Sequence, residues 1–177
     1  MKPNQLKSIA LKVKKLGEES RKHLGCGFPE TIFQNALAIE LRKNKIEYLK
    51  EVNIEVFYKG ESVGVDRPDF IITKISGFKK PFILEIKVAD KITDDHRAQL
   101  KSYCTSLPKN NNPVLNGFAG GMLLTFPKCD IDSCPTMKVF VVDSSFNVIL
   151  DDQKDEDIKK QLEKEKQKES KKVKVKK

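Results

Sequence analysis

The segment that most constrains the fold of this sequence is the alternating run at residues 82–88, FILEIKV. Alternation of this kind predicts a β-strand. Side chains two positions apart point the same way on a strand, so Glu85 and Lys87 share one face and the opposite face is entirely apolar. The same alternation occurs in any strand with one face toward water, so the Glu-x-Lys pair alone does not indicate chemistry.

A second acid in the preceding segment makes the pair more informative. Asp69 ends a polar approach at residues 66–69, DRPD, and opens the hydrophobic run FII at residues 70–72. An acid and a base side by side over a sheet, with another acid one strand away, can bind a divalent cation and handle a water molecule beside it.

The rest of the chain predicts helices on both sides of these strands. Apolar periodicity indicates helices over residues 6–24 and from Pro29 to about residue 44, and a third over residues 93–107 with Thr93 as its N-cap. Strands are predicted at residues 52–59, 62–74, 82–88, 122–126 and 137–142, with a polar loop at residues 108–116. This order predicts an α/β fold in which a mixed central sheet is flanked by helices.

Composition divides the chain into a body and a tail. Residues 1–150 form one predicted domain, whereas residues 151–177 are almost entirely Lys, Glu, Asp and Gln and predict a disordered segment or a solvated helix. The formal net charge is +9, of which the tail supplies a minority, with eleven Lys against eight acids. A basic body is compatible with a phosphate-bearing partner, but a Lys-rich composition does not prove one.

The absence of targeting segments and the spacing of the cysteines indicate where the protein resides and which metal centres are disfavoured. The first residues have no apolar core of a signal peptide, and no run approaches the length of a membrane span. We therefore expect an intracellular protein, in the cytoplasm or nucleus, that is not secreted and not in a membrane. The four cysteines (Cys26, Cys104, Cys129 and Cys134) match no standard zinc pattern, and their spacing disfavours an iron–sulfur cluster.

Three helical residues join the candidate set. Glu30 lies in the first turn of the second helix. Gln99 and Tyr103, with His96, lie on one face of the third helix because residues three, four and seven apart are neighbours there. Each has a plain structural alternative: Glu30 favours the positive end of a helix dipole, and Tyr103 suits a core aromatic with its hydroxyl at the rim.

Taken together, these segments resemble the GxxExxY proteins of the PD-(D/E)XK nuclease superfamily, whose core is restriction-endonuclease-like. The resemblance covers about residues 9–127. It is carried by the run GFPETIF at residues 27–33, by Asp69, by the Glu85–Lys87 strand, by the Gln99 and Tyr103 helix, and by the strand GMLLTF at residues 121–126. Phe33 stands where the family has Tyr, and the Lys-rich tail lies outside the family pattern.

The resemblance implies metal-assisted cleavage of phosphodiester bonds in nucleic acid, with DNA favoured over RNA. It implies Mg²⁺ or Mn²⁺ held by Asp69, Glu85 and the backbone carbonyl of Ile86, with Glu30 completing the site directly or through water. Lys87 is then expected to orient a water molecule or to stabilise the charged transition state. Gln99 and Tyr103 are expected to position the phosphate or the strand.

Two matters stay open at this level. The alternative function is a catalytically silent nuclease-fold module that binds nucleic acid or a protein partner. Nucleases of this class often act as symmetric assemblies, so a homo-oligomer is among the expected states.

Overall fold

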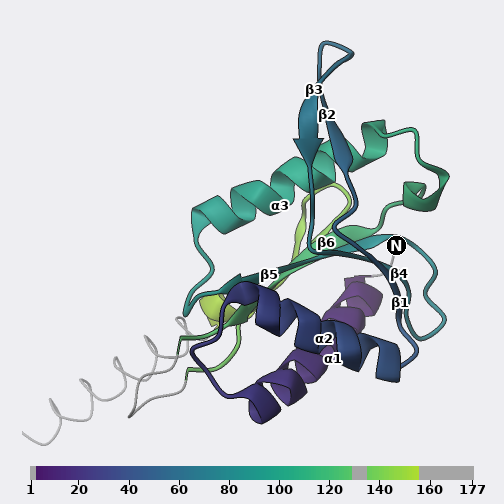
Figure 1. Ribbon diagram of the computed structural model, residues 1–177. Coiled ribbons are helices and arrows are strands. Elements are labelled where there is room, and N and C mark those ends of the chain that lie inside the picture. The colour runs from purple at the N-terminus through teal and green to yellow at the C-terminus, as the bar shows by residue number, and fades with distance from the viewer. Residues whose placement is uncertain (1–2, 129–134, 156–177) are drawn as a thin grey trace, which may run out of the picture.

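Two helical layers enclose a central sheet in the computed structural model, which describes residues 3–128 and 135–155 (Figure 1). Helices α1 (Pro3–Leu24) and α2 (Glu30–Lys43) cover one face of the sheet, and α3 (Asp94–Ser106) covers the other. The predicted α/β class, with a mixed sheet flanked by helices, is confirmed. Within the described ranges, no helix is long and apolar enough to cross a membrane.

The main sheet has six strands in the order β1-β4-β5-β6-β7-β8. Its strands are β1 (Glu47–Lys50), β4 (Phe70–Lys74), β5 (Phe82–Val88), β6 (Gly120–Phe126), β7 (Val139–Asp143) and β8 (Val148–Asp151). Only β5 and β6 pair in parallel, and all the other neighbours are antiparallel. Parallel strands need a crossover connection, and α3 provides it.

Alternate residues of β5 supply two separate cores. Leu84 and Ile86 pack with the α1 and α2 side, where the cluster includes Leu37. Ile83 packs with the α3 side, beside Leu100. The predicted alternation of β5 is therefore confirmed. However, the face that carries Glu85 and Lys87 is covered by α3 and is not a solvent-facing surface.

The prediction of one continuous strand over residues 62–74 is wrong. Strand β3 (Glu61–Asp66) pairs with β2 (Ile54–Tyr58) in a separate hairpin that projects from the body, and β4 begins only at Phe70 (Figure 1). The break contains Pro68, which has no N–H to donate to a strand ladder. Asp69 therefore lies in the connection between two sheets and not inside a strand.

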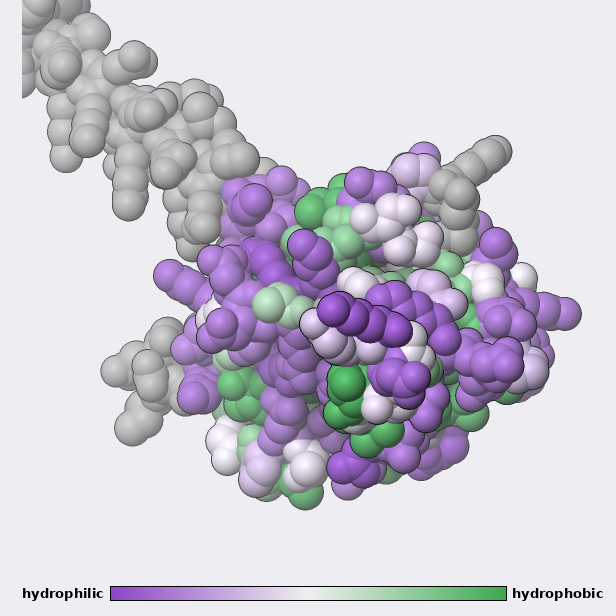
Figure 2. All heavy atoms as spheres, turned by 90° about the horizontal axis from the view of Figure 1, so that it is seen from above, coloured by the Kyte–Doolittle hydropathy of each residue, from purple (hydrophilic) through white to green (hydrophobic). Residues whose placement is uncertain are grey.

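The hairpin is fixed at its base and polar around its end. The Asn110 side chain exchanges two hydrogen bonds with the backbone of Glu55, at 2.8 and 3.0 Å. Figure 2 looks down on the projecting hairpin, and the surface on that side is mostly hydrophilic, with apolar side chains in scattered groups. The hairpin is thus tied to the loop after α3 at its base, and it exposes Tyr58, Val63 and Val65 farther out.

The two outer strands of the sheet, β1 and β8, were not among the predicted elements. Both contain only four residues, so they offer too little alternation to be recognised. Asp151, the first residue assigned to the tail, is buried in β8 and forms an ion pair with Arg97 at 3.2 Å. Asp152 likewise pairs with Lys14 at 2.8 Å, so the packed body extends beyond residue 150.

Cys104 is a buried, free thiol in the core beneath α3, as its helical position predicted. Burial raises the pKa of this thiol to about 12. Iron–sulfur clusters are held by thiolates, so a thiol that keeps its proton is a poor ligand. Cys129 and Cys134 lie outside the described residues.

We predict that Gly120→Ala destabilises the protein by about 2–4 kcal/mol, because a side chain there meets both overpacking and backbone strain. Gly120 has φ 139°, and an added Cβ would lie 2.8 Å from the Cα of Asp143 and still closer to the Val142 carbonyl oxygen. Urea unfolding measures the change as a lower midpoint at unchanged slope. Gly64→Ala is the matched control, because a Cβ there meets nothing within 4 Å; equal midpoints for the two variants would contradict the prediction.

Candidate active site

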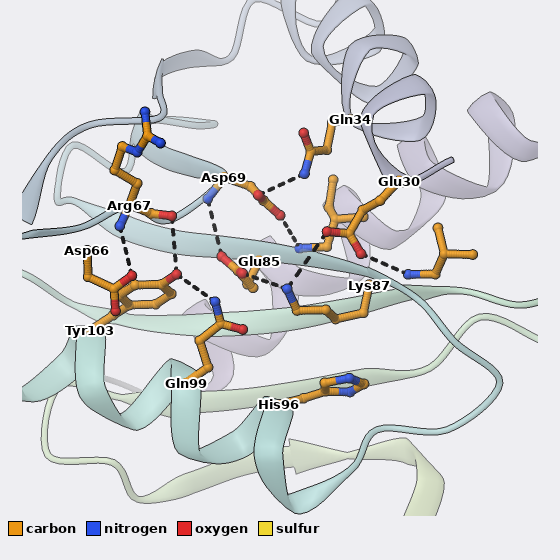
Figure 3. A network of polar contacts seen from close by, with 12 residues as sticks. Glu30, Gln34, Asp66, Arg67, Asp69, Glu85, Lys87, His96, Gln99 and Tyr103 are labelled. Atoms are coloured by element: carbon orange, nitrogen blue, oxygen red, sulfur yellow. Dashed lines mark hydrogen bonds and ion pairs between the residues drawn. The ribbon is translucent and has the colours of Figure 1, made fainter. Parts of the chain in front are cut away.

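The candidate residues gather where β4 stops pairing with β5. That pairing ends at the Phe70–Leu84 pair. Beyond that pair, side-chain carboxylates accept the backbone N–H groups of β5 in place of a neighbouring strand. The Ile86 N–H donates to Asp69 Oδ2 at 2.8 Å, and the Val88 N–H donates to Glu30 Oε2 at 3.1 Å (Figure 3). Two acids from different elements are thus held by one strand edge.

Glu85 and Lys87 complete this group from β5 itself. Glu85 is only 2% exposed, and its Oε2 accepts the backbone N–H of Asp69 at 3.2 Å. The Lys87 ammonium donates to Glu85 Oε1 at 2.9 Å and lies 3.8 Å from Glu30 Oε1. The structure therefore brings together all four of the charged residues that the sequence singled out.

The charges in this group are unbalanced. Burial raises the pKa of Asp69 to about 6, and burial together with the negative charge of Asp69 raises that of Glu85 to about 7. Burial opposes the charged form of Lys87, but Glu85, Glu30 and Asp69 outweigh that effect and raise the pKa of Lys87. At neutral pH, the Lys87 ammonium is fully charged, and the two buried carboxyls compete with each other for ionisation.

The donor set fits a hard divalent cation in its chemistry. All the candidate donors are oxygens, which Mg²⁺ and Mn²⁺ prefer. The N–H and C=O groups of one strand residue face the same neighbouring strand, so the Ile86 carbonyl faces the edge occupied by Asp69. Among the described residues, however, no three acids, histidines or cysteines are arranged as a metal site. Metal binding by Glu30, Asp69, Glu85 and Ile86 stays a prediction.

Gln34 belongs to the group, although sequence reasoning did not single it out. Its Nε2 donates to Asp69 Oδ1 at 2.8 Å, and the residue is 6% exposed (Figure 3). It lies four residues after Glu30 on α2, so both side chains leave the same helix face. That spacing is the one signal that could have found it.

Gln99 and Tyr103 come from α3, which covers the face of the sheet that carries Glu85 and Lys87. The Tyr103 hydroxyl accepts from Gln99 Nε2 at 2.9 Å and donates to the Arg67 carbonyl oxygen at 3.2 Å. Tyr103 is 1% exposed, and burial raises its pKa, so its hydroxyl stays neutral. Tyr103 thus tethers the segment that leads into Asp69; contact of either residue with a phosphate stays a prediction.

His96 and Phe33 have structural roles here. His96 Nδ1 accepts the backbone N–H of Thr93 at 3.2 Å and closes a capping box at the start of α3. Burial first, and then the charge of Lys87, lower its pKa. Phe33 stacks on Phe126 with ring centroids 4.5 Å apart. No hydroxyl is needed at Phe33, because both of its aromatic neighbours are apolar rings.

Comparison with known proteins agrees with this geometry. A family model described as the PD-(D/E)XK nuclease superfamily matches residues 7–133, a range that contains every candidate residue from Glu30 to Tyr103. Searches of curated proteins and of solved structures find no match. The narrower resemblance to the GxxExxY proteins stays a prediction.

We predict that Glu85→Gln changes how stability depends on pH when no metal is present. A carboxyl whose folded pKa is raised contributes stability at pH values below its unfolded pKa and loses it as the pH rises through the folded pKa. The wild type should therefore lose stability between about pH 4.5 and pH 7, where Glu85 ionises beside Asp69. Relative to the wild type, Glu85→Gln should gain about 2 kcal/mol between pH 5 and pH 8.

The measurement is urea unfolding in EDTA at several pH values. Glu61→Gln serves as the control because Glu61 is exposed on the hairpin. A constant difference between Glu85→Gln and the wild type across this range would refute the expected repulsion between the two buried carboxyls.

Proposed function

This chain belongs to the PD-(D/E)XK nuclease superfamily, and we propose that it is a nuclease that uses Mg²⁺ or Mn²⁺ to hydrolyse phosphodiester bonds, in DNA rather than RNA. The observation that carries the proposal is the pairing of Asp69 with buried Glu85 at one strand edge, beside the Lys87 ammonium. Burial raises the pKa of both acids, and buried acids with raised pKa values are a feature of functional sites. A bound divalent cation would supply the positive charge that the Asp69 and Glu85 carboxylates lack.

The metal would be held by Asp69, Glu85 and the Ile86 carbonyl, with Glu30 completing the site directly or through water. The chemistry that such an ion supplies is neutralisation of phosphate charge and a lower pKa for a nearby water molecule. In the metal-free arrangement, Lys87 binds Glu85 and lies close to Glu30. The Lys87 ammonium therefore partly neutralises the acids before a metal binds.

Lys87 acts as a hydrogen-bond donor and a fixed positive charge. Its raised pKa keeps the ammonium charged at neutral pH. A fixed positive charge beside the acids can orient an attacking water molecule or stabilise the additional negative charge of the transition state. Lys87 would supply this charge from the same strand face as Glu85, to which it donates a hydrogen bond.

Gln99 and Tyr103 divide the positioning of the substrate between them. Gln99 is the residue of the pair that presents an amide toward the acids, and we assign it the contact with phosphate (Figure 3). Tyr103 fixes both Gln99 and the segment before Asp69 through its hydroxyl. When both strands of a duplex are cut, we propose that a symmetric assembly supplies the second site.

We predict that purified protein cleaves labelled DNA with Mg²⁺ or Mn²⁺ and not in EDTA. Asp69→Asn, Glu85→Gln and Lys87→Met should each reduce the rate by at least about 100-fold. The first two would remove a charged metal ligand, and the third would remove the ammonium that stabilises the transition state. A gel assay on linear, nicked and single-stranded DNA, with matched RNA, measures the rates. Glu61→Gln and Lys79→Met, both exposed and outside the group, are the matched controls.

A catalytically silent module gives a different result. It would bind nucleic acid with the same affinity in EDTA and in Mg²⁺, and would release no product in either. Cleavage that survives unchanged in Lys87→Met would also overturn the proposal, because it would point to a contaminating nuclease.

We predict that Gln34→Leu lowers metal affinity by about 10–100-fold, because residues that orient a metal ligand affect binding on this scale. The substitution removes the donor to Asp69 Oδ1 and leaves the helix intact. Calorimetric titration with Mn²⁺ measures the affinity. Gln5→Leu, the same change at an exposed position of α1, should have no effect; equal affinities for the two variants would refute the assigned role of Gln34.

A further inference from the structure

A surface pocket next to the candidate active site has no part in the reaction described above. Its volume is about 440 Å³, and it is lined by Gly27, Phe28, Pro29, Val88 and Lys128. Sites for small ligands usually measure roughly 300–1,000 Å³ and are mostly apolar, with a few polar groups. The pocket therefore has the size and lining to take one flat, partly apolar group.

The pocket shares a wall with the active site. Pro29 precedes Glu30 in the chain, and Val88 follows Lys87. Consecutive side chains of a strand point to opposite faces, so Val88 and Lys87 do not lie side by side. Glu30 links them at the end of β5, because the Lys87 ammonium lies 3.8 Å from Glu30 Oε1. The hydrogen bond from the Val88 N–H to the Glu30 carboxylate joins these two walls at 3.1 Å. A nucleic acid with one phosphate beside Lys87 would therefore place a neighbouring nucleoside at the pocket.

Phe28 gives the pocket an aromatic ring that is fixed in place. The residue is 42% exposed, and its ring meets Phe33 edge-on, with centroids 6.4 Å apart and an interplanar angle of 78°. Phe33 is itself stacked on Phe126 in the core. An exposed ring with a buried support can stack against a base at little cost in side-chain entropy.

The charge at the pocket also suits a nucleotide. Lys128 is exposed at its rim, and its backbone N–H donates to Asp90 Oδ1 at 2.8 Å, which holds the main chain of Lys128 in place. No described residue that lines the pocket is acidic. An ammonium group can bind the phosphate of a nucleotide, and an aromatic ring can stack on its base.

We propose that this pocket is a nucleobase subsite, which takes one unpaired base of the substrate strand next to the scissile phosphodiester. The base stacks on Phe28, and its phosphate binds Lys128. The inference rests on the proposed function and refines its substrate, because a base inside a duplex is already stacked on its neighbours and must leave the stack to enter a pocket. The preferred substrate is thus a strand with at least one unpaired nucleotide beside the cut.

The test measures binding without cleavage. Fluorescence anisotropy in EDTA gives the affinity of the full chain for single-stranded oligonucleotides, each lacking one base at a different position. One abasic position should weaken binding by the wild type about 10-fold, which corresponds to the loss of one stacked base. Phe28→Leu should weaken binding of the intact strand by the same factor and should be insensitive to that abasic position.

Three further variants make the result specific. Phe28→Tyr keeps the ring and should behave as the wild type. Tyr58→Leu removes another exposed aromatic, on the projecting hairpin, and should change nothing. Lys128→Met should weaken binding of every oligonucleotide and reduce the salt dependence of binding, because it removes a phosphate contact.

Several results would overturn the subsite: no sensitivity to any abasic position, equal sensitivity in Phe28→Leu and the wild type, equally tight binding of a blunt duplex, or no binding at all. None of them depends on cleavage. Failure of base discrimination with intact metal-dependent cleavage would remove the subsite alone, and base discrimination without cleavage would remove the nuclease activity alone.

Discussion

The structure of this site depends on the end of β5 that has no β4 residue to pair with. Strand β5 continues past the last residue that β4 can pair with, so its remaining N–H groups at that edge need other acceptors. The carboxylates of Asp69 and Glu30 meet that need, at Ile86 and Val88. The same hydrogen bonds that satisfy the backbone therefore fix two acids within reach of Glu85 and Lys87. An unpaired edge, which is usually a liability, becomes the support of a charged site.

In the folded state, this arrangement holds negatively charged groups close together, and their repulsion lowers stability. Asp69 and Glu85 are acids in a poorly hydrated position, and one ammonium does not neutralise three carboxylates. Such a cluster costs stability that neutral residues of the same size would not cost. Under the proposed function, a doubly charged ion would relieve this repulsion as well as form new bonds. The cost in stability would then favour binding of a divalent cation.

The sequence was most informative where one local pattern decides the structure. The alternation around Glu85 and the N-cap at Thr93 each specify an element within a few residues, and both are confirmed. Local sequence patterns did not predict the structure where contacts between residues far apart in the sequence determine it. Pro68 is the local signal that separates β3 from β4. The two strands belong to different sheets because β3 pairs with β2, whereas β4 pairs with β1 and β5. Gln34 was missed for the same reason, since a helical Gln gains meaning only when Asp69 lies opposite.

The two faces of the sheet contribute differently to the site, and the division follows from β5. Its alternate residues belong to separate cores, so α2 and α3 are each positioned by packing that is largely independent of the other. Helix α2 brings Glu30 and Gln34 to the acids, and α3 brings Gln99 and Tyr103 to the segment before Asp69. The two halves of the site meet at the end of β5 and at the segment that leads into Asp69. A substitution in either core therefore shifts one half of the site against the other, and the Glu85–Lys87 strand is the part that must stay fixed for any chemistry to occur there.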